Sequence, residues 1–239
     1  MGGSGGEYPI PMQQILVINS KGGCGKTTIT TNLACAYTSQ GFKTVLMDYD
    51  PQGSSTRWLK LRPADKPEIT GINAHKRQAA NQTLAFHLRM PPETERVIID
   101  APAGVSGEHL RQLVKAVDTI IIPVLPSPID IHSATYFIKD LLLTGNVRQN
   151  GVRIGVLANR TRKQTRVYKS LELFLNSLKL PFIGSIRDTQ NYVHAFERGV
   201  GVHEMWDKRV EQDRAHWLPI INWLENNANL KAVLQQHSI

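Results

Sequence analysis

The segment that most constrains this chain is a glycine-rich stretch, SKGGCGKTT, at residues 20–28. It follows an apolar run at 15–18 and precedes a helix-like segment at 29–40. A buried strand, a glycine-rich turn and a helix form the arrangement in which backbone N–H groups and a helix N-terminus surround phosphate groups. Glycines are needed because Cβ atoms would keep an anion away from those N–H groups. The sequence therefore predicts a nucleoside triphosphate site near the start of the chain.

The loop departs from the usual pattern in one informative way. Lys26 and Thr27 stand where side chains reach the β- and γ-phosphates and ligate Mg²⁺. The pattern G-x-x-x-x-G-K-[ST] is nevertheless not met, because Ser20 replaces its first glycine and a second lysine, Lys21, follows. We therefore expect two lysines with different tasks. The predicted nucleotide contacts of the loop are Gly22, Gly23, Cys24, Gly25, Lys26, Thr27 and Thr28.

Apolar strands alternate with helical segments along the chain. The predicted strands cover 15–19, 43–47, 69–74, 97–99, 119–124, 153–158 and 182–186. The predicted helices cover 27–40, 54–61, 78–88, 108–116, 129–143, 165–178, 191–197 and 210–225. This alternation predicts an α/β fold with a mostly parallel twisted sheet and helices on both faces, and the glycine-rich loop after the first strand indicates the P-loop NTPase type. We expect a flexible linker at 1–12, a single domain at 13–226 and a polar tail at 227–239.

Acidic residues follow two further predicted strands. Asp48 and Asp50 lie in DYDPQGS at 48–54, and Asp100 begins DAPAG at 100–104. The carboxyl ends of parallel strands meet at one edge of a sheet, where such folds bind their ligands. We therefore expect these carboxylates to lie close to the glycine-rich loop. Asp100, after a core strand, fits the acidic position that supports Mg²⁺.

The three segments together resemble the motifs of the ParA/MinD family of deviant Walker A ATPases. KGGCGKTT at 21–28 is similar to that family's phosphate loop, DYDPQGS resembles a segment of its ParA branch, and DAPAG resembles its switch. They occur in family order, and the resemblance covers 15–225. It implies ATP and Mg²⁺ as cofactors and a homodimer formed with ATP. It also implies slow hydrolysis, stimulated by a ParB-like or cargo-adaptor protein.

The resemblance also implies roles for single residues. Lys21 would cross the dimer interface to the partner's nucleotide, as an arginine finger does. Asp50 would orient the attacking water, so that the catalytic set is Lys21, Lys26 and Asp50. Gly104 would let the switch backbone approach the γ-phosphate, and Asn159 would contact the adenine. The residues implied around Mg²⁺ are Thr27, Asp48 and Asp100.

Positive charge is concentrated in the later part of the chain. The net charge is +8, of which residues 148–239 carry +6, and no acidic residue lies between Leu141 and Leu171. A field of one sign favours a polyanionic partner. Members of the ParA branch bind DNA without sequence preference, and the absence of an aromatic platform argues against base readout. The predicted DNA contacts are Arg162, Lys163, Arg166, Lys169, Arg187, Arg198, Lys208 and Arg209.

Other members of this fold class remain as alternatives. A MinD-like membrane ATPase would need a basic amphipathic C-terminal helix, but the tail after Glu225 has one base, Lys231, so we expect no membrane binding. Iron–sulfur reductases need more cysteines than Cys24 and Cys35. A small-molecule ligase or synthetase would lack DPQG, and a tyrosine kinase would have a tyrosine-rich tail. The favoured expectation is a cytoplasmic, nucleoid-associated ATPase that segregates DNA or positions a protein cargo, such as carboxysomes or chemoreceptor clusters.

Overall fold

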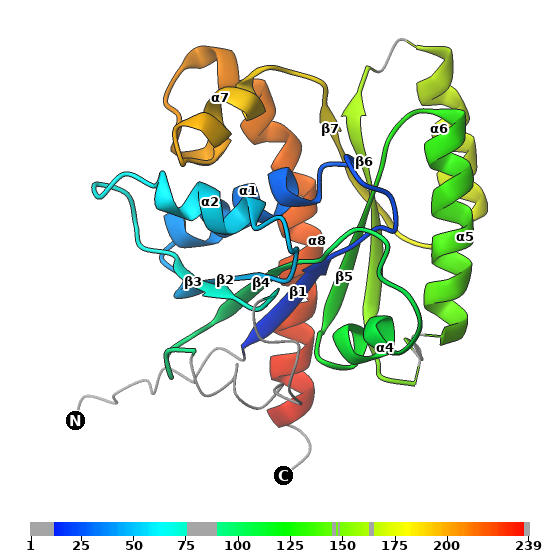
Figure 1. Cartoon of the computed structure of the whole chain (residues 1–239), viewed down its shortest axis with the longest axis horizontal. Coiled ribbons are helices and arrows are strands. Elements are labelled where there is room, and N and C mark those ends of the chain that lie inside the picture. Colours follow the sequence, from blue (N-terminus) through cyan, green and yellow to red (C-terminus); the bar gives the residue numbers. More distant parts are fainter. Residues whose placement is uncertain (1–11, 76–89, 145–146, 148, 163–164, 237–239) are drawn as a thin grey trace.

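A seven-stranded, wholly parallel sheet forms the centre of the molecule (Figure 1). The computed structural model describes residues 12–75, 90–144, 147, 149–162 and 165–236, with the side chains of 144 and 227–236 excepted. The strands lie in the order β3-β2-β4-β1-β5-β6-β7. Their bounds are β1 Gln13–Val17, β2 Thr44–Asp48, β3 Thr70–Asn73, β4 Arg96–Asp100, β5 Thr119–Val124, β6 Arg153–Thr161 and β7 Phe182–Arg187. The predicted α/β fold is confirmed.

Helices cover both faces of this sheet (Figure 1). On one face lie α4 Gly107–Lys115, α5 Pro128–Thr144 and α6 Arg166–Ser177. On the other lie α1 Lys26–Ser39, α2 Ser54–Lys60, α7 Asn191–Glu197 and α8 Glu211–Gln236, with the short 3-10 turns η2 Val202–Glu204 and η3 Lys208–Val210. Side chains of a strand point alternately to opposite faces, so Leu16 joins the first core and Ile15 and Val17 join the second.

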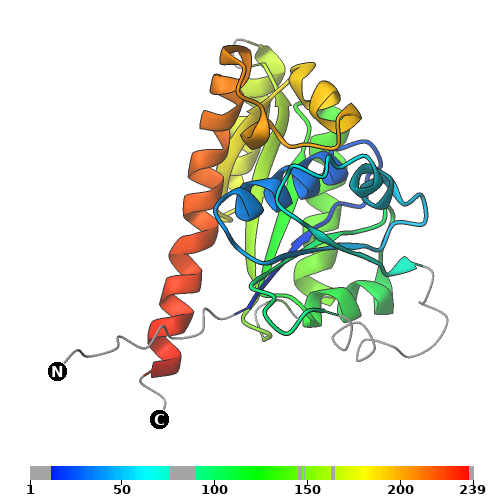
Figure 2. The same ribbon diagram turned by 90° about the vertical axis from the view of Figure 1, so that its left-hand side faces the viewer.

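The C-terminal helix differs from its prediction. The expected helix ends near Glu225, but α8 continues to Gln236, and Pro219 lies inside it rather than interrupting it. Figure 2 shows α8 as a long helix along one side of the molecule, extending past the sheet. The close packing of α8 on β7 depends on a glycine in that strand, because a Cβ built on Gly184 would lie 2.9 Å from Ile220 of α8. A proline removes one helical hydrogen bond, which packing of this kind on the sheet offsets.

The strand β6 is longer than predicted. It runs to Thr161, three residues beyond the predicted end at Ala158, so Asn159 and Arg160 belong to the strand. Arg160 has a positive φ of 50°, and the pairing of β6 with β7 is irregular there, so the strand bends at its end. The helix predicted at 78–88 lies outside the described residues.

Candidate functional site

The glycine-rich loop joins β1 to α1 in the shape its sequence predicts. Gly23 and Gly25 have φ values of 75° and 93°, which residues with a Cβ rarely adopt. The amide nitrogen of Asn159 donates a hydrogen bond of 2.8 Å to the Cys24 carbonyl oxygen. A Cβ on Gly25 would lie 2.1 Å from that same nitrogen. The end of β6 therefore packs directly against the loop, and glycine is required at this contact.

The packing of Asn159 bears on its expected role. Its side chain is buried, and its amide oxygen accepts the N–H of Arg160 at 2.9 Å. Both ends of the amide thus bond to backbone groups, one of them in the phosphate loop. The structure gives this side chain a bracing contact, whereas contact with an adenine stays a prediction.

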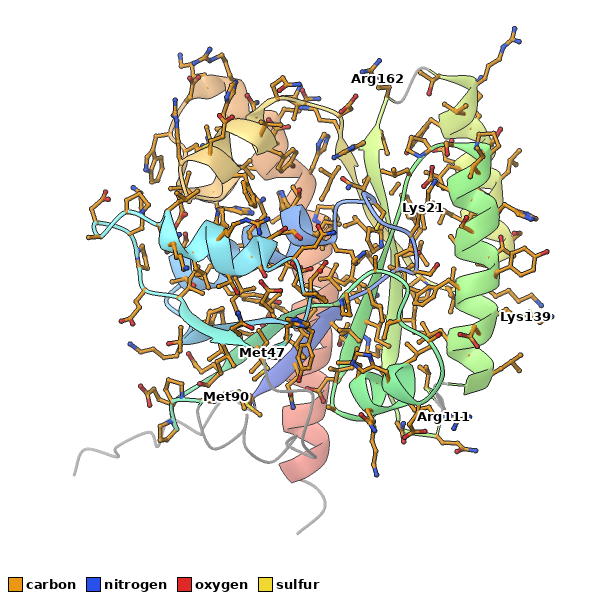
Figure 3. The ribbon with its side chains drawn as sticks, viewed as in Figure 1. Lys21, Met47, Met90, Arg111, Lys139 and Arg162 are labelled. Carbon is orange, nitrogen blue, oxygen red and sulfur yellow. The ribbon has the colours of Figure 1, made fainter. Side chains whose placement is uncertain are left out.

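The two lysines of the loop have different surroundings. Lys26 is buried, and its ammonium donates to the carbonyl oxygens of Asn19 at 3.4 Å and Lys21 at 3.2 Å. The side chain of Lys21 is 36% exposed, and its ammonium lies 2.7 Å from a carboxylate oxygen of Asp130 in α5. Figure 3 shows Lys21 on the side of the loop that faces α5. The predicted division between these lysines thus has a structural counterpart.

Asp100 lies beside the first turn of α1. Its Oδ2 accepts a 2.8 Å hydrogen bond from the hydroxyl of Thr27, while its buried Oδ1 has no hydrogen-bond partner among the described residues. Burial raises the pKa of Asp100 to about 7, and the nearby charge of Asp48 adds to that effect, against the hydrogen bond from Thr27. A site that penalises a carboxylate in this way is suited to a cation, which would offset the buried charge.

Asp48 and Asp50 belong to one braced loop. Asp48 pairs with Asp100 in the register of β2 and β4, so their carboxyl ends coincide. The carboxylate of Asp48 accepts the N–H of Asp50 at 3.0 Å and both the N–H and the hydroxyl of Thr56 at 2.8 Å. Asp50 is half-buried, and its carboxylate accepts only the N–H of Gln52, at 2.9 Å, among the described contacts. Asp48 therefore shapes the loop that presents Asp50.

The DAPAG segment lies against the phosphate loop. Gly104 adopts a φ of 71°, and its N–H donates a 2.8 Å hydrogen bond to the carbonyl oxygen of Ser20. Ala101 N–H donates to the carbonyl oxygen of Val17 at 3.3 Å, so the segment follows the end of β1 closely. The structure thus brings all three sequence motifs to the carboxyl ends of β1, β2 and β4.

These residues fit a magnesium nucleotide. The loop glycines Gly22 and Gly23 have open space where a Cβ would stand, so an anion can approach their backbone. Thr27 supplies a hydroxyl ligand of the kind Mg²⁺ accepts, and Asp100 has an unpaired oxygen beside it. The three bonds to Asp48 occupy both of its oxygens, so its place around Mg²⁺ stays a prediction.

The predicted DNA contacts separate into distinct groups. Arg166 and Lys169 on α6 and Arg198 and Lys208 near α7 and η3 are exposed, but the two pairs belong to opposite faces of the sheet. Three further arginines form ion pairs, of which the first two are also exposed: Arg162 with Asp188 at 2.7 Å, Arg209 with Asp207 at 2.5 Å and Arg187 with Asp213 at 2.5 Å. Lys163 lies outside the described residues, and Figure 3 labels Arg162 just beyond the end of β6.

Arg187 differs most from its expected role. Asp213 is fully buried and also accepts a hydrogen bond of 2.6 Å from Asn191, so the pair links β7, α7 and α8. A buried carboxylate needs such a counter-ion. Arg187 therefore has a structural role in the packing between these elements, and its contact with DNA stays a prediction.

Sequence reasoning missed two residues of this region. Asn19 donates from its amide to the Pro123 carbonyl oxygen at 2.7 Å and accepts the N–H of Lys21, so it links the phosphate loop to β5. Asp130 is the partner of Lys21. The spacing of Ser127 and Asp130 after Pro126 is a helix-start signal, but such a signal says nothing about a cation from another loop.

The described residues contain no helix with the length and apolarity that a membrane crossing requires. A family model described as CobQ/CobB/MinD/ParA nucleotide binding domain matches residues 15–202. The chain is 29% identical over 194 residues to maintenance of carboxysome distribution protein A of Halothiobacillus neapolitanus, covering 80% of this chain and 87% of that protein.

Two solved structures share the fold. An ATP complex of McdA from Cyanothece has a TM-score of 0.67 and 18% identity, and the match covers 87% of this chain and 96% of that one. MinD of Pyrococcus horikoshii with Mg-ADP has a TM-score of 0.70 and 16% identity, and the match covers 92% of this chain and 98% of that one. Together with the motifs and their placement, these matches establish that the chain belongs to the CobQ/CobB/MinD/ParA family of nucleotide-binding domains.

Proposed function

We propose that this protein is an ATPase that dimerises on binding ATP, binds DNA nonspecifically as a dimer, and so positions or segregates a cargo on the nucleoid. The observation that carries the proposal is the meeting of the three ParA-like motifs at one edge of the sheet. Lys21 and Lys26, the Thr27–Asp100 pair and the braced Asp50 loop lie together there. The family also includes proteins of other functions, and DYDPQGS favours the ParA branch.

Each residue has a task that follows from its surroundings. Lys26, buried beside main-chain carbonyls, would hold the phosphates of the nucleotide in its own subunit. Thr27 and Asp100 would hold Mg²⁺, which supplies neutralisation of the phosphate charge when bound. Asp50, half-buried on a loop fixed by Asp48, would orient the attacking water.

Dimerisation would complete the site. The side chain of Lys21 is exposed enough to reach a second subunit, and its charge would stabilise the phosphates only when two subunits meet. Gly104, hydrogen-bonded to Ser20, would let the switch backbone respond to whether a γ-phosphate is bound, and so change the surface that this segment forms. A separate adaptor protein would then stimulate hydrolysis and release the dimer from DNA.

The proposed cargo follows from the relatives. A carboxysome distribution protein is similar over most of both chains, and ParA and Soj partitioning proteins match over about half of this one. We favour a protein cargo such as carboxysomes or chemoreceptor clusters, with a plasmid or chromosome as the other candidate. Exposed cations on α6 and near α7 supply the charge that nucleoid binding requires.

An Asp50→Ala variant tests the proposal directly. It should bind ATP and shift DNA in gels at low salt as the wild type does, but hydrolyse ATP about 100-fold more slowly. The shift should need ATP and weaken steeply with salt. Loss of ATP binding in this variant would refute the water-positioning role, and no ATP-dependent shift in the wild type would favour an enzyme acting on a small molecule.

A further inference from the structure

Asp130 is a nearly buried carboxylate fixed at the start of α5. Its side chain is 9% exposed, one oxygen accepts the hydroxyl of Ser127, and its own N–H donates to that Ser127 oxygen at 3.1 Å. Ser127 precedes the helix and Asp130 is its third residue, so the pair caps the helix. These bonds and the favourable helix N-terminus hold the carboxylate in place. Asp130 therefore cannot follow a partner that moves away.

Lys21 is the partner that can move. The carbonyl oxygen of Lys21 accepts the Lys26 ammonium and the Cys24 thiol, so its backbone is held within the loop. Its side chain, in contrast, is partly exposed and ends in a 2.7 Å contact with Asp130. Lysine is a point charge on a flexible stem, so the ammonium can leave without disturbing the loop.

The ammonium group of Lys21 has two competing partners, Asp130 in its own subunit and the nucleotide of a second subunit. Within the described part of the chain, Lys21 makes the one ion pair of Asp130. A carboxylate this buried is costly without a counter-ion. The proposed trans role sends the same ammonium to phosphates in a second subunit. The two positions exclude one another, and the free energy of the pair opposes the dimer.

We propose that Asp130 is a positioning residue that retains Lys21 within its own subunit, and that dimerisation on ATP must break this contact. The inference rests on the proposed ATP-driven dimer. Asp130 then sets how readily the dimer forms and suppresses contact between subunits that lack nucleotide, because only a nucleotide offers Lys21 a stronger anion. The motif P-S-P-x-D at 126–130 thereby acquires a role beyond starting a helix.

The test is an Asp130→Asn variant, whose amide retains the shape beside Ser127 but loses the charge that holds Lys21. With a non-hydrolysable ATP analogue and Mg²⁺, sedimentation velocity should give a dimer dissociation constant roughly three- to tenfold lower than that of the wild type. Basal ATP hydrolysis should rise with the dimer population. Glu108→Gln is the matched control, since Glu108 is an exposed acid in the first turn of α4 and should leave dimerisation unchanged.

A second background shows whether the effect passes through Lys21. In a Lys21→Gln protein, adding Asp130→Asn should not strengthen the dimer, because no ammonium remains to be retained. An unchanged dimer in the single Asp130→Asn variant would overturn the proposal. A weaker dimer would also overturn it, and would show that Asp130 supports Lys21 in the orientation that the dimer needs. If the wild type binds the analogue yet stays monomeric, the ATP-driven dimer itself fails. Strengthening in the Lys21→Gln background would exclude a role for the ion pair.

Discussion

The edge where β1, β2 and β4 end and the basic region from β6 to η3 both carry many charges, but the fold treats them in opposite ways. At the nucleotide edge, Lys26, Asp48 and Asp100 are buried and each is held by specific hydrogen bonds. In the basic region, Arg166 and Lys169 are exposed. A nucleotide site depends on fixed geometry, whereas binding to a polyanion depends on the summed field. Single substitutions should therefore be severe at the first region and graded at the second.

One arginine of the basic region, Arg187, is held by specific contacts as the residues of the nucleotide edge are. Its substitution has the largest expected effect, which is on the free energy of unfolding. Arg187→Ala leaves the fully buried Asp213 without its counter-ion, so the variant should lose about 3 kcal/mol of unfolding free energy. The measurement is a urea denaturation midpoint. Arg162→Ala is the matched control: its pair with Asp188 is exposed on both sides, and the loss should stay below about 1 kcal/mol. Equal losses in the two variants would contradict the structural role of Arg187.

The two lysines of the phosphate loop sharpen the comparison within the nucleotide edge. Lys26→Ala should weaken ATP binding by about 100-fold, because it removes the buried ammonium that we propose binds the phosphates. Lys21→Ala should leave ATP binding by the monomer within about threefold while abolishing dimer-dependent hydrolysis. Titration with a fluorescent ATP analogue measures ATP binding and a steady-state assay measures hydrolysis, so together they distinguish the effects of the two variants. Intact ATP binding by Lys26→Ala would show that the loop is wrongly assigned.

Much of the nucleotide edge could be predicted from the sequence. A phosphate loop must place glycine and lysine at fixed spacing after a strand, and parallel strands bring Asp48 and Asp100 to one edge. The core strands were predictable because they are apolar on both faces. Both features are local in sequence, or follow from the sheet topology without any side-chain detail.

The remaining features depend on contacts between distant residues. Nothing near Arg187 indicates that Asp213 will be buried beside it, and nothing near Lys21 indicates Asp130. Pro219 favours a helix end by local rules, but close packing of α8 against Gly184 keeps the helix intact. These are tertiary effects, and they account for both the ion pair of Arg187 with Asp213 and the length of α8, neither of which the sequence predicted.

The two groups of exposed cations give a graded effect. Charge reversal of Arg166 and Lys169 together should lower DNA affinity about tenfold at low salt and reduce the salt dependence, if α6 faces DNA. Reversal of Arg198 and Lys208 makes the same test for the opposite face. Because the groups cover opposite faces, we expect one double variant to act far more strongly than the other. Equal and small losses of DNA affinity in the two double variants would show that neither face alone makes the contact with DNA.

The smallest effect concerns pH at Asp100. Its pKa in the folded protein is about 7 against 3.8 for an ordinary aspartate, so the folded form retains a proton that the unfolded form has lost. Without Mg²⁺, stability should therefore decrease as the pH rises from 3.8 toward 7. Magnesium favours the ionised carboxylate, so the affinity for Mg²⁺ in the nucleotide complex should be about threefold higher at pH 8 than at pH 6.

Asp100→Asn isolates that contribution. Its amide keeps a partner for Thr27 but cannot ionise, so magnesium titrations of the variant at pH 6, 7 and 8 should show a weaker pH dependence than those of the wild type, with a lower affinity than the wild type at pH 8. The nucleotide phosphates also titrate in this range, but they do so equally in both proteins. An identical pH dependence in the two would assign it to the nucleotide alone. A steeper dependence in the wild type than in the variant would identify the buried carboxylate as a group that Mg²⁺ deprotonates.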